Sequence, residues 1–230
     1  MQNKLKTIVV LTGSGISAES GINTFRKSNG LWEEHRIEDV ATPEAWHRNP
    51  NLVLEFYNKR RKQIIEAIPN AAHLALAELE KKYKVVIITQ NVDDLHERAG
   101  SSSVMHLHGE IKKSRSTFDS NLVYPIEGWE LKLGDTCEMG SQLRPHIVWF
   151  GEAVPTYSEA EHRVGQADIF ILIGSSLNVY PAAGLIHAVK EQASRIVIDP
   201  DANIIDPTLG FRIIAENAVA GMAKLLQELV

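Results

Sequence analysis

The sequence predicts an α/β fold: a doubly wound, mainly parallel Rossmann-like sheet with a small inserted module and a helical lid insertion. Short apolar runs rich in β-branched residues alternate with segments of helical period, which is the pattern of strand–helix–strand units. These runs are almost continuously apolar, as expected of parallel strands that are buried on both faces. A glycine-rich turn directly follows the first run. The expected strands cover residues 7–11, 84–89, 104–107, 147–150, 168–173 and 195–198.

The helices expected around these strands follow from apolar spacing and from a capping signal. Thr42 and Pro43 are typical of a helix start, because a threonine oxygen can cap the helix and proline fits its first turn. Helical apolar spacing predicts further helices over residues 52–68, 70–82, 158–167, 181–193 and 215–230.

We expect a single domain over residues 1–230, built from three parts. The large Rossmann-like lobe comprises about 1–19, 84–109 and 145–230. Residues 20–83 are expected to form the helical lid insertion. The stretch after the glycine-rich turn is polar and turn-rich, and no convincing strand occurs before residues 85–89. An insertion there can close over a bound nucleotide. Residues 110–144 contain few regular runs and are expected to form the small module.

Composition excludes several classes of protein. Hydrophobic residues make up 44% of the chain and charged residues 23%, which is typical of a soluble globule. A net charge of −5 provides no overall attraction to nucleic acid or to an anionic membrane. No apolar run approaches the roughly 20 residues of a membrane span, and residues 1–6 are too polar for a secretion signal. The single cysteine excludes an internal disulfide and a multi-cysteine metal site. We therefore expect a cytoplasmic protein. We also expect a monomer, although none of these observations bears on the oligomeric state.

The glycine-rich turn after the first strand has the G-x-G-x-x-A form of a dinucleotide-binding fingerprint. Gly13 permits a tight turn, Gly15 lets the backbone approach a pyrophosphate, and the small Ala18 lets the next helix pack closely. The N–H groups of that helix would then point at the phosphates. A tight strand–helix turn without a ligand is the alternative.

Polar side chains follow three of the other expected strands. Because the carboxyl ends of parallel strands meet at one sheet edge, where open α/β sheets bind ligands, these side chains are candidates for a shared site. They are Gln90, Asn91 and Asp93 after residues 84–89, Gly174, Ser175 and Ser176 after 168–173, and Asp199 after 195–198. Ordinary capping turns are the alternative for each of the three groups.

Two histidines at the end of the strand over 104–107 are candidates for chemistry. His106 and His108 lie two residues apart and so share one face of a strand, as in a metal-binding pair. No third ligand stands nearby with convincing spacing. A neutral histidine at a strand end is better suited to a general base, and His108, next to Gly109, is the candidate. A structural histidine is the alternative.

With these residues in view, the chain resembles the sirtuins, which are NAD-dependent protein lysine deacylases. The matching blocks occur in family order over essentially the whole chain. They are Gly13–Arg26, Thr89–Asp93 (TQNVD), Leu107–Gly109 (LHG), Leu143–Glu152 (LRPHIVWFGE) and Gly174–Leu177 (GSSL). Ser14 stands where the family usually has alanine, and Ser175 where it usually has threonine.

The resemblance implies a reaction and roles for particular residues. The acyl-lysine carbonyl oxygen attacks a ribose carbon of NAD as nicotinamide leaves, and His108 removes a ribose hydroxyl proton so that the hydroxyl attacks the imidate. The products are free lysine, nicotinamide and O-acyl-ADP-ribose. The implied catalytic residues are His108, Asn91 and Asp93. The implied NAD-binding residues are Gly13, Ser14, Gly15, Ala18, Glu19, Ile22, Phe25, Arg26, Trp32, Gln90, Asn91, Asp93, His108, Gly174, Ser175, Ser176, Asp199 and Ala218.

On the acyl side, the resemblance implies that Val148, Phe150 and Gly151 bind the acylated lysine of a protein substrate. Tyr57 and Arg60 share one face of the expected helix, and this Tyr-x-x-Arg spacing resembles the bacterial class III-like subclass that removes acidic acyl groups. A guanidinium can bind a carboxylate through two hydrogen bonds, to which a phenol adds a third. The alternative is that Arg60 belongs to a solvated basic face. The resulting expectation is an enzyme that removes acetyl and also succinyl or malonyl groups.

One departure concerns a structural metal. Between its HG and LRP blocks the family usually carries four cysteines, and these cysteines hold zinc. The corresponding interval here contains Ser114, Ser116, Cys137 and Gly140, so we predict no zinc. A small apolar cluster is expected to hold the module instead; its members are Phe118, Leu122, Tyr124 and Trp129.

Two other functions remain open. One is an ADP-ribosyltransferase on the same fold, and the other is a catalytically silent module that binds NAD or ADP-ribose. The presence of His108, Asn91 and Asp93 argues against the silent module.

Overall fold

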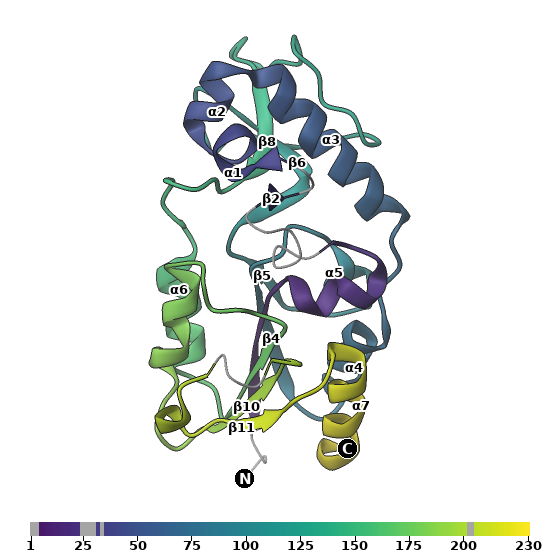
Figure 1. Ribbon diagram of the computed structural model, residues 1–230, viewed down its shortest axis with the longest axis vertical. Coiled ribbons are helices and arrows are strands. Elements are labelled where there is room, and N and C mark those ends of the chain that lie inside the picture. Colours follow the sequence, from purple (N-terminus) through teal and green to yellow (C-terminus); the bar gives the residue numbers. More distant parts are fainter. Residues whose placement is uncertain (1–4, 24–30, 33–34, 202–204) are drawn as a thin grey trace.

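A parallel sheet forms the centre of the computed structural model, which describes residues 5–23, 31–32, 35–201 and 205–230. Within these residues six parallel strands pair in the order β11-β10-β9-β1-β4-β5 (Figure 1). The strands are β1 (Thr7–Thr12), β4 (Lys84–Thr89), β5 (Val104–His106), β9 (Ile169–Ile173), β10 (Ser194–Ile198) and β11 (Arg212–Ile214). The helices and strands alternate as expected, which confirms the doubly wound fold class.

The register of the central strands aligns their carboxyl ends. Thr12 at the end of β1 pairs with Thr89 of β4 and with Ile173 of β9. The residues that follow these three strands therefore emerge side by side at one edge of the sheet. This is the edge where the sequence places its glycine-rich and polar turns.

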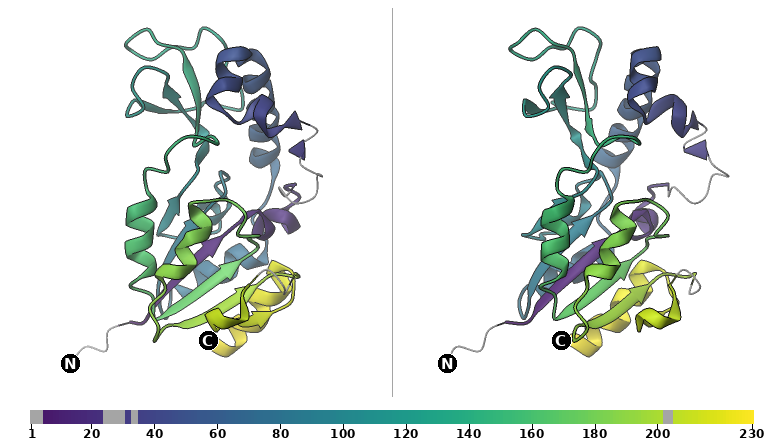
Figure 2. Two further views of the ribbon diagram at one scale, coloured as in Figure 1. Left: turned by 60° about the vertical axis from the view of Figure 1, so that its left-hand side comes forward. Right: turned by 90° about the vertical axis from the view of Figure 1, so that its left-hand side faces the viewer.

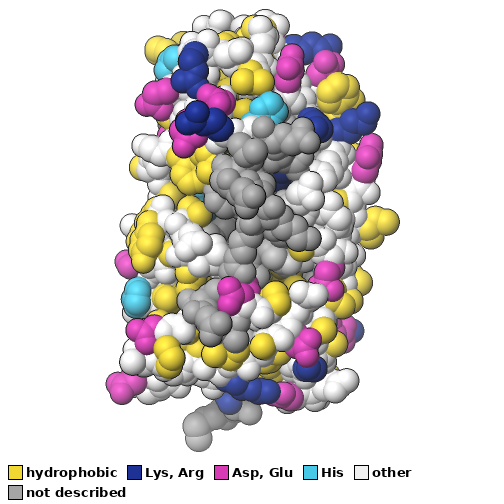
Figure 3. Space-filling view, viewed as in Figure 1, with side chains coloured by type: hydrophobic (Ala, Val, Ile, Leu, Met, Phe, Trp, Pro, Cys, Tyr) yellow, Lys and Arg dark blue, Asp and Glu magenta, His cyan; other side chains and the backbone are white. Residues whose placement is uncertain are grey.

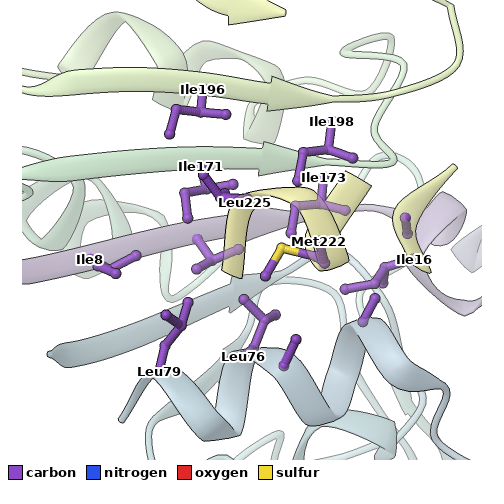
Figure 4. Packing of buried hydrophobic residues seen from close by; sticks show 14 of the residues in the cluster. Ile8, Ile16, Leu76, Leu79, Ile171, Ile173, Ile196, Ile198, Met222 and Leu225 are labelled. Atoms are coloured by element: carbon purple, nitrogen blue, oxygen red, sulfur yellow. The ribbon is translucent and has the colours of Figure 1, made fainter. Parts of the chain in front are cut away.

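Helices cover both faces of the sheet. Alternate residues of β1 point to opposite faces, so that Ile8 and Val10 belong to one buried cluster and Val9 and Leu11 to the other. The first face is covered by α4 (Ala71–Leu79) and α7 (Ala218–Leu229), whose leucines and Met222 pack on strand isoleucines (Figure 4). The second face is covered by α6 (Tyr157–Val164) and the 3₁₀ helix η3 (Ala182–Ala188). Helix α4, which lies within the expected insertion over 20–83, thus packs on the sheet.

A second group of elements lies at the end of the molecule away from the C-terminus (Figures 1 and 2). An antiparallel sheet pairs its strands in the order β7-β6-β8, and three helices pack beside it around their own buried core. These elements are β6 (Gly109–Ser116), β7 (Val123–Pro125), β8 (Leu143–Ile147), α1 (Ile37–Val40), α2 (Pro43–Arg48) and α3 (Pro50–Glu66). The remaining elements are η1 (Ser14–Ser20), β2 (Leu31–Trp32), β3 (His35–Arg36), α5 (Leu95–Arg98) and η5 (Pro207–Leu209).

Three expectations about secondary structure were wrong or incomplete. Residues 110–144 contain most of the antiparallel sheet, which the sequence conceals because Ser114 and Ser116 are polar at buried positions of β6. The strand expected over 147–150 ends at Ile147. The Val148 N–H still donates to the His108 carbonyl, but Trp149 N–H donates to Glu152 and Phe150 N–H to the Ala41 carbonyl, so no ladder continues. The helix expected over 181–193 is a 3₁₀ helix from 182 to 188.

The starts of α2 and α3 follow their side-chain caps. The Thr42 oxygen accepts a hydrogen bond from the Ala45 amide at 3.0 Å, as expected for the start of α2. Asn49 caps α3 in the same way through the Leu52 amide, so α3 begins at Pro50, two residues earlier than expected. No helix among the described residues is long and apolar enough to cross a membrane.

The small module is attached to α3 by buried polar side chains. The Arg61 guanidinium donates to the carbonyl oxygens of Ile111 (2.6 Å) and Trp129 (2.8 Å). It also donates to the Asn58 side chain, whose amide bonds both the N–H and the carbonyl of Leu131. The expected apolar cluster is wrong, because Phe118 is 74% exposed and Trp129 43%. We define Asn58 and Arg61 as the α3 clamp.

A hydrogen-bonded turn contains residues of the interval where the resemblance led us to look for zinc-binding cysteines. The Ser116 oxygen lies 3.3 Å from Cys137 Sγ and accepts from the amides of Phe118 and Asp119. The Gly140 amide bonds the Cys137 carbonyl. Serine and glycine side chains do not supply the thiolate or imidazole ligands that structural zinc requires. Among the described residues, no group of three or more His, Cys, Asp or Glu side chains is arranged to hold a metal.

We therefore expect the purified, active protein to contain zinc well below one atom per chain. Elemental analysis measures this directly. A chelator should leave both activity and the thermal unfolding midpoint unchanged. Stoichiometric zinc, or activity that is lost to a chelator and restored by zinc, would contradict the prediction.

Candidate active site

A cavity of about 550 Å³ lies at the carboxyl edge of the parallel sheet. Its walls come from the loops after β1, β4, β9 and β10 and from α3 and the segment after β8. Of the site residues named from the sequence, those lining it are Gly13, Ser14, Gly15, Ala18, Glu19, Ile22, Tyr57, Arg60, Gln90, Asn91, Asp93, His108, Val148, Phe150, Gly151, Gly174, Ser175, Ser176, Asp199 and Ala218. Phe25, Arg26 and the side chain of Trp32 lie outside the described residues.

The glycines after β1 are required by contact with the loop after β9. Gly15 N–H donates to the Gly174 carbonyl at 2.9 Å, and a Cβ on Gly15 would lie 2.6 Å from Gly174 Cα. A Cβ on Gly13 would lie 2.7 Å from the same carbonyl oxygen. The sequence interpretation assigned these glycines to a turn and to pyrophosphate approach, whereas the structure shows that they let two backbone loops touch. The helix that follows is the short 3₁₀ helix η1.

The loop after β4 is held from both sides. The Asn91 side-chain amide donates to the Gly13 carbonyl and to Ser17, each at 3.2 Å. Ser17 in turn donates to Asp93 Oδ2, and the other Asp93 oxygen accepts from the Leu95 amide. Burial, opposed by these hydrogen bonds, raises the pKa of Asp93. Ser17 thus joins the two loops, a role that sequence reasoning missed because a serine in a glycine-rich turn carries no distinctive signal.

The hydrogen bond of His108 determines which of its ring nitrogens is basic. Its Nδ1 lies 3.0 Å from the Gln90 carbonyl oxygen, which only accepts, so Nδ1 carries the proton and Nε2 is the unprotonated nitrogen. Burial lowers the pKa of His108 below the ordinary histidine value. The ring is therefore neutral at pH 7 and suited to accept a proton.

His106 has the opposite character. Its ring contacts two acceptors, the Asn91 carbonyl (3.0 Å) and the Glu97 carboxylate (2.8 Å). Burial lowers the pKa of His106, but the hydrogen bond and charge of Glu97, together with the Asn91 hydrogen bond and the charge of Glu110, outweigh burial, so the net shift is upward. The two histidines thus have separate partners, and His106 holds the loop after β4.

Comparison with known proteins now identifies the chain. A family model described as Sir2 family matches residues 13–181. The chain belongs to the Sir2 family. It is 55% identical over 226 residues to an NAD-dependent protein deacylase of Helicobacter pylori, covering 98% of each protein. It is 51% identical to a protein of the same name from Bacteroides thetaiotaomicron, covering 98% of this chain and 99% of that one.

Solved Sir2 structures share the fold. A Sir2 homologue in complex with NAD superimposes with a TM-score of 0.88 at 41% identity, over 98% of this chain and 90% of that chain. A Sir2 variant with a deacetylated p53 peptide and 3′-O-acetyl ADP-ribose superimposes with a TM-score of 0.83 at 31% identity, over 98% and 94%.

At the far end of the cavity from the sheet, this Sir2-family chain buries a tyrosine and an arginine. Tyr57 is fully buried and Arg60 is 5% exposed, whereas Lys59 and Lys62 of the same basic run are exposed. The run is therefore divided between interior and solvent, and Arg60 does not belong to a solvated face. By contrast, acidic and basic side chains lie side by side over α1 and α2 (Figure 3), where Arg48 pairs with Asp39.

The opposite end of the cavity approaches α7. Glu19 accepts a hydrogen bond from the Val219 amide at 2.9 Å, so its carboxylate holds the first turn of that helix. Asp199 is buried and accepts from the Asp201 amide. Gln90 donates to Ser175 at 2.9 Å, which ties the loops after β4 and β9 together. Sequence reasoning also missed Trp149, which lines the cavity beside Tyr57.

Proposed function

We propose that this chain is an NAD-dependent protein deacylase that removes acetyl groups, and also succinyl or malonyl groups, from lysine side chains of proteins. Relatives of that name at about half identity support the deacylase activity. The observation that carries the proposal is His108: a neutral imidazole, with its proton fixed on Nδ1, lies in the cavity that also contains the loops after β1 and β9.

The cavity fits NAD. The close contact of Gly13 and Gly15 with Gly174 leaves backbone and small side chains along one wall, where phosphates can approach. Ser176 and Asp199 provide a hydroxyl and a carboxylate for ribose oxygens, and Asn91 and Asp93 would lie at the nicotinamide end. When bound, NAD supplies the ribose carbon that receives the acyl oxygen as nicotinamide leaves.

The roles of the chain's own residues follow from their contacts. His108 accepts a ribose hydroxyl proton at Nε2, and its donation to the Gln90 carbonyl stabilises the ring as it becomes charged. Asn91 and Asp93 hold the loop beside the reaction, since their side chains are fixed by Ser17. Val148, Phe150 and Gly151 line the cavity, and we assign them to binding the acylated lysine.

Tyr57 and Arg60 support the preference for acidic acyl groups. Both side chains line the cavity and both are buried, so an acyl carboxylate that reached them would be shielded from water. Burial raises the pKa of Tyr57 above its usual value, so the phenol keeps its proton and can donate. If the buried positive charge that pairs with an acidic ligand is removed, most of the affinity that the ligand's carboxylate contributes is lost.

Replacing Arg60 with methionine should lower the ratio of desuccinylation to deacetylation. A charge-assisted hydrogen-bonded pair contributes roughly 1.5–3 kcal/mol, which corresponds to about a 10- to 150-fold change in that ratio. The measurement is kcat/KM for matched succinyl- and acetyl-lysine peptides. Lys59→Met, on the exposed side of the same helix, is the matched control and should leave the ratio unchanged. Equal loss of both activities, or no change, would assign Arg60 a structural role.

The activity itself is tested with acetyl- and succinyl-lysine peptides, with and without NAD. Mass spectrometry should detect free lysine peptide and O-acyl-ADP-ribose only when NAD is present. ADP-ribose attached to the protein substrate would instead identify a transferase. NAD binding without turnover of either peptide would identify a silent binding module.

A further inference from the structure

The phenol of Tyr57 is bound by a side chain that can only donate. Trp149 Nε1 lies 3.1 Å from the Tyr57 hydroxyl oxygen, and an indole N–H has no acceptor capacity. The phenol oxygen therefore accepts from Trp149, and the phenol hydrogen is directed away from the indole. Both side chains are buried: Trp149 is 2% exposed and Tyr57 fully enclosed.

The indole is itself held in place by charged neighbours. The backbone N–H of Trp149 donates to Glu152 at 2.8 Å, and the Arg144 guanidinium lies 3.2 Å from the indole ring centroid. Glu152 also accepts from Arg144 and from Arg115. These contacts fix the ring, so the direction of its N–H is set before any ligand enters.

A carboxylate at neutral pH accepts hydrogen bonds and donates none. A tyrosine that is to recognise it must point its O–H at the ligand. A neighbour that could accept, such as a carbonyl or an amide oxygen, would compete for that hydrogen, whereas Trp149 cannot. Tyr57, Arg60 and Trp149 all line the same cavity.

We propose that Trp149 is a positioning residue for acyl selectivity: its indole N–H orients the Tyr57 hydroxyl as a donor toward the carboxylate of an acidic acyl group. The inference rests on the proposed removal of such groups. Trp149 itself makes no contact with the acyl carboxylate and acts on it through the Tyr57 hydroxyl. Its effect falls on recognition of the acid and therefore on KM for succinyl peptides.

The experiment is a double-mutant cycle of Trp149→Phe and Tyr57→Phe, each of which removes one polar group and keeps the ring. In Trp149→Phe, the ratio of kcat/KM for succinyl over acetyl peptide should fall by about 3- to 10-fold, mainly through a higher KM for the succinyl peptide. In the Tyr57→Phe background, the same substitution should lower the ratio no further. Trp46→Phe, which changes another buried indole packed on Trp149, is the control and should leave the ratio unchanged.

Three outcomes would overturn the inference. Trp149→Phe could lower both activities equally, lower the ratio as strongly without the Tyr57 hydroxyl, or leave the ratio unchanged. Should Trp149→Phe fail to fold, solvent exchange of the Trp149 indole proton, followed by NMR, replaces it: exchange should be faster in Tyr57→Phe than in the wild type, and equal rates would contradict the hydrogen bond. A wild-type protein without desuccinylase activity would instead refute the proposed acyl range.

Discussion

Replacing His108 with alanine should reduce turnover by roughly 10²- to 10⁴-fold while NAD binding persists. The reason is the fixed tautomer: donation from Nδ1 to the Gln90 carbonyl leaves Nε2 as the basic nitrogen inside the cavity. Single-turnover rates measure the chemical step, and calorimetry measures NAD affinity. His162→Ala, at an exposed histidine on α6, is the control and should match the wild type.

The pH dependence of the rate provides a second measure of the same group. Burial lowers the pKa of His108, so the neutral, basic form persists at lower pH than for an ordinary histidine. Activity should therefore decline on the acid side only below the usual histidine range, which lies near pH 6.5. Near-normal turnover in His108→Ala, or an acid limb above that range, would remove His108 as the base.

Replacing Arg61 with methionine should have the largest effect on stability, lowering the free energy of unfolding by about 3–4 kcal/mol. The side chain is fully buried, and its removal leaves the carbonyls of Ile111 and Trp129 without their donor. The Asn58 side chain loses one of its partners and keeps Leu131. Burial lowers the pKa of Arg61 to about 10, which keeps it charged at neutral pH.

Chemical denaturation of the whole chain measures this effect. Lys62→Met changes the next residue, which is exposed, and should alter stability by less than about 0.5 kcal/mol. Because Arg61 lies one residue beyond Arg60 on α3, loosening of the α3 clamp should also lower desuccinylation. A stability loss below about 1 kcal/mol would show that the small module is held mainly by other contacts.

The sequence alone determined five of the six described strands of the parallel sheet, β11 being missed, and the edge where the candidate site lies. Both follow from local physics: buried parallel strands are continuously apolar, and strands that start in register end in register, which brings Gly13, Gln90 and Gly174 together. The position of His108 at that edge was predictable for the same reason, since it follows β5.

Only the tertiary structure decided what depends on partners distant in the sequence. It buried Arg60 and Arg61 while leaving Lys59 and Lys62 in solvent, because α3 packs against β6 and β8 on one side only. It showed that the glycine-rich loops need glycine in order to touch each other. It paired Trp149 with Tyr57 across 92 residues, since a buried donor and acceptor satisfy each other wherever the chain brings them together.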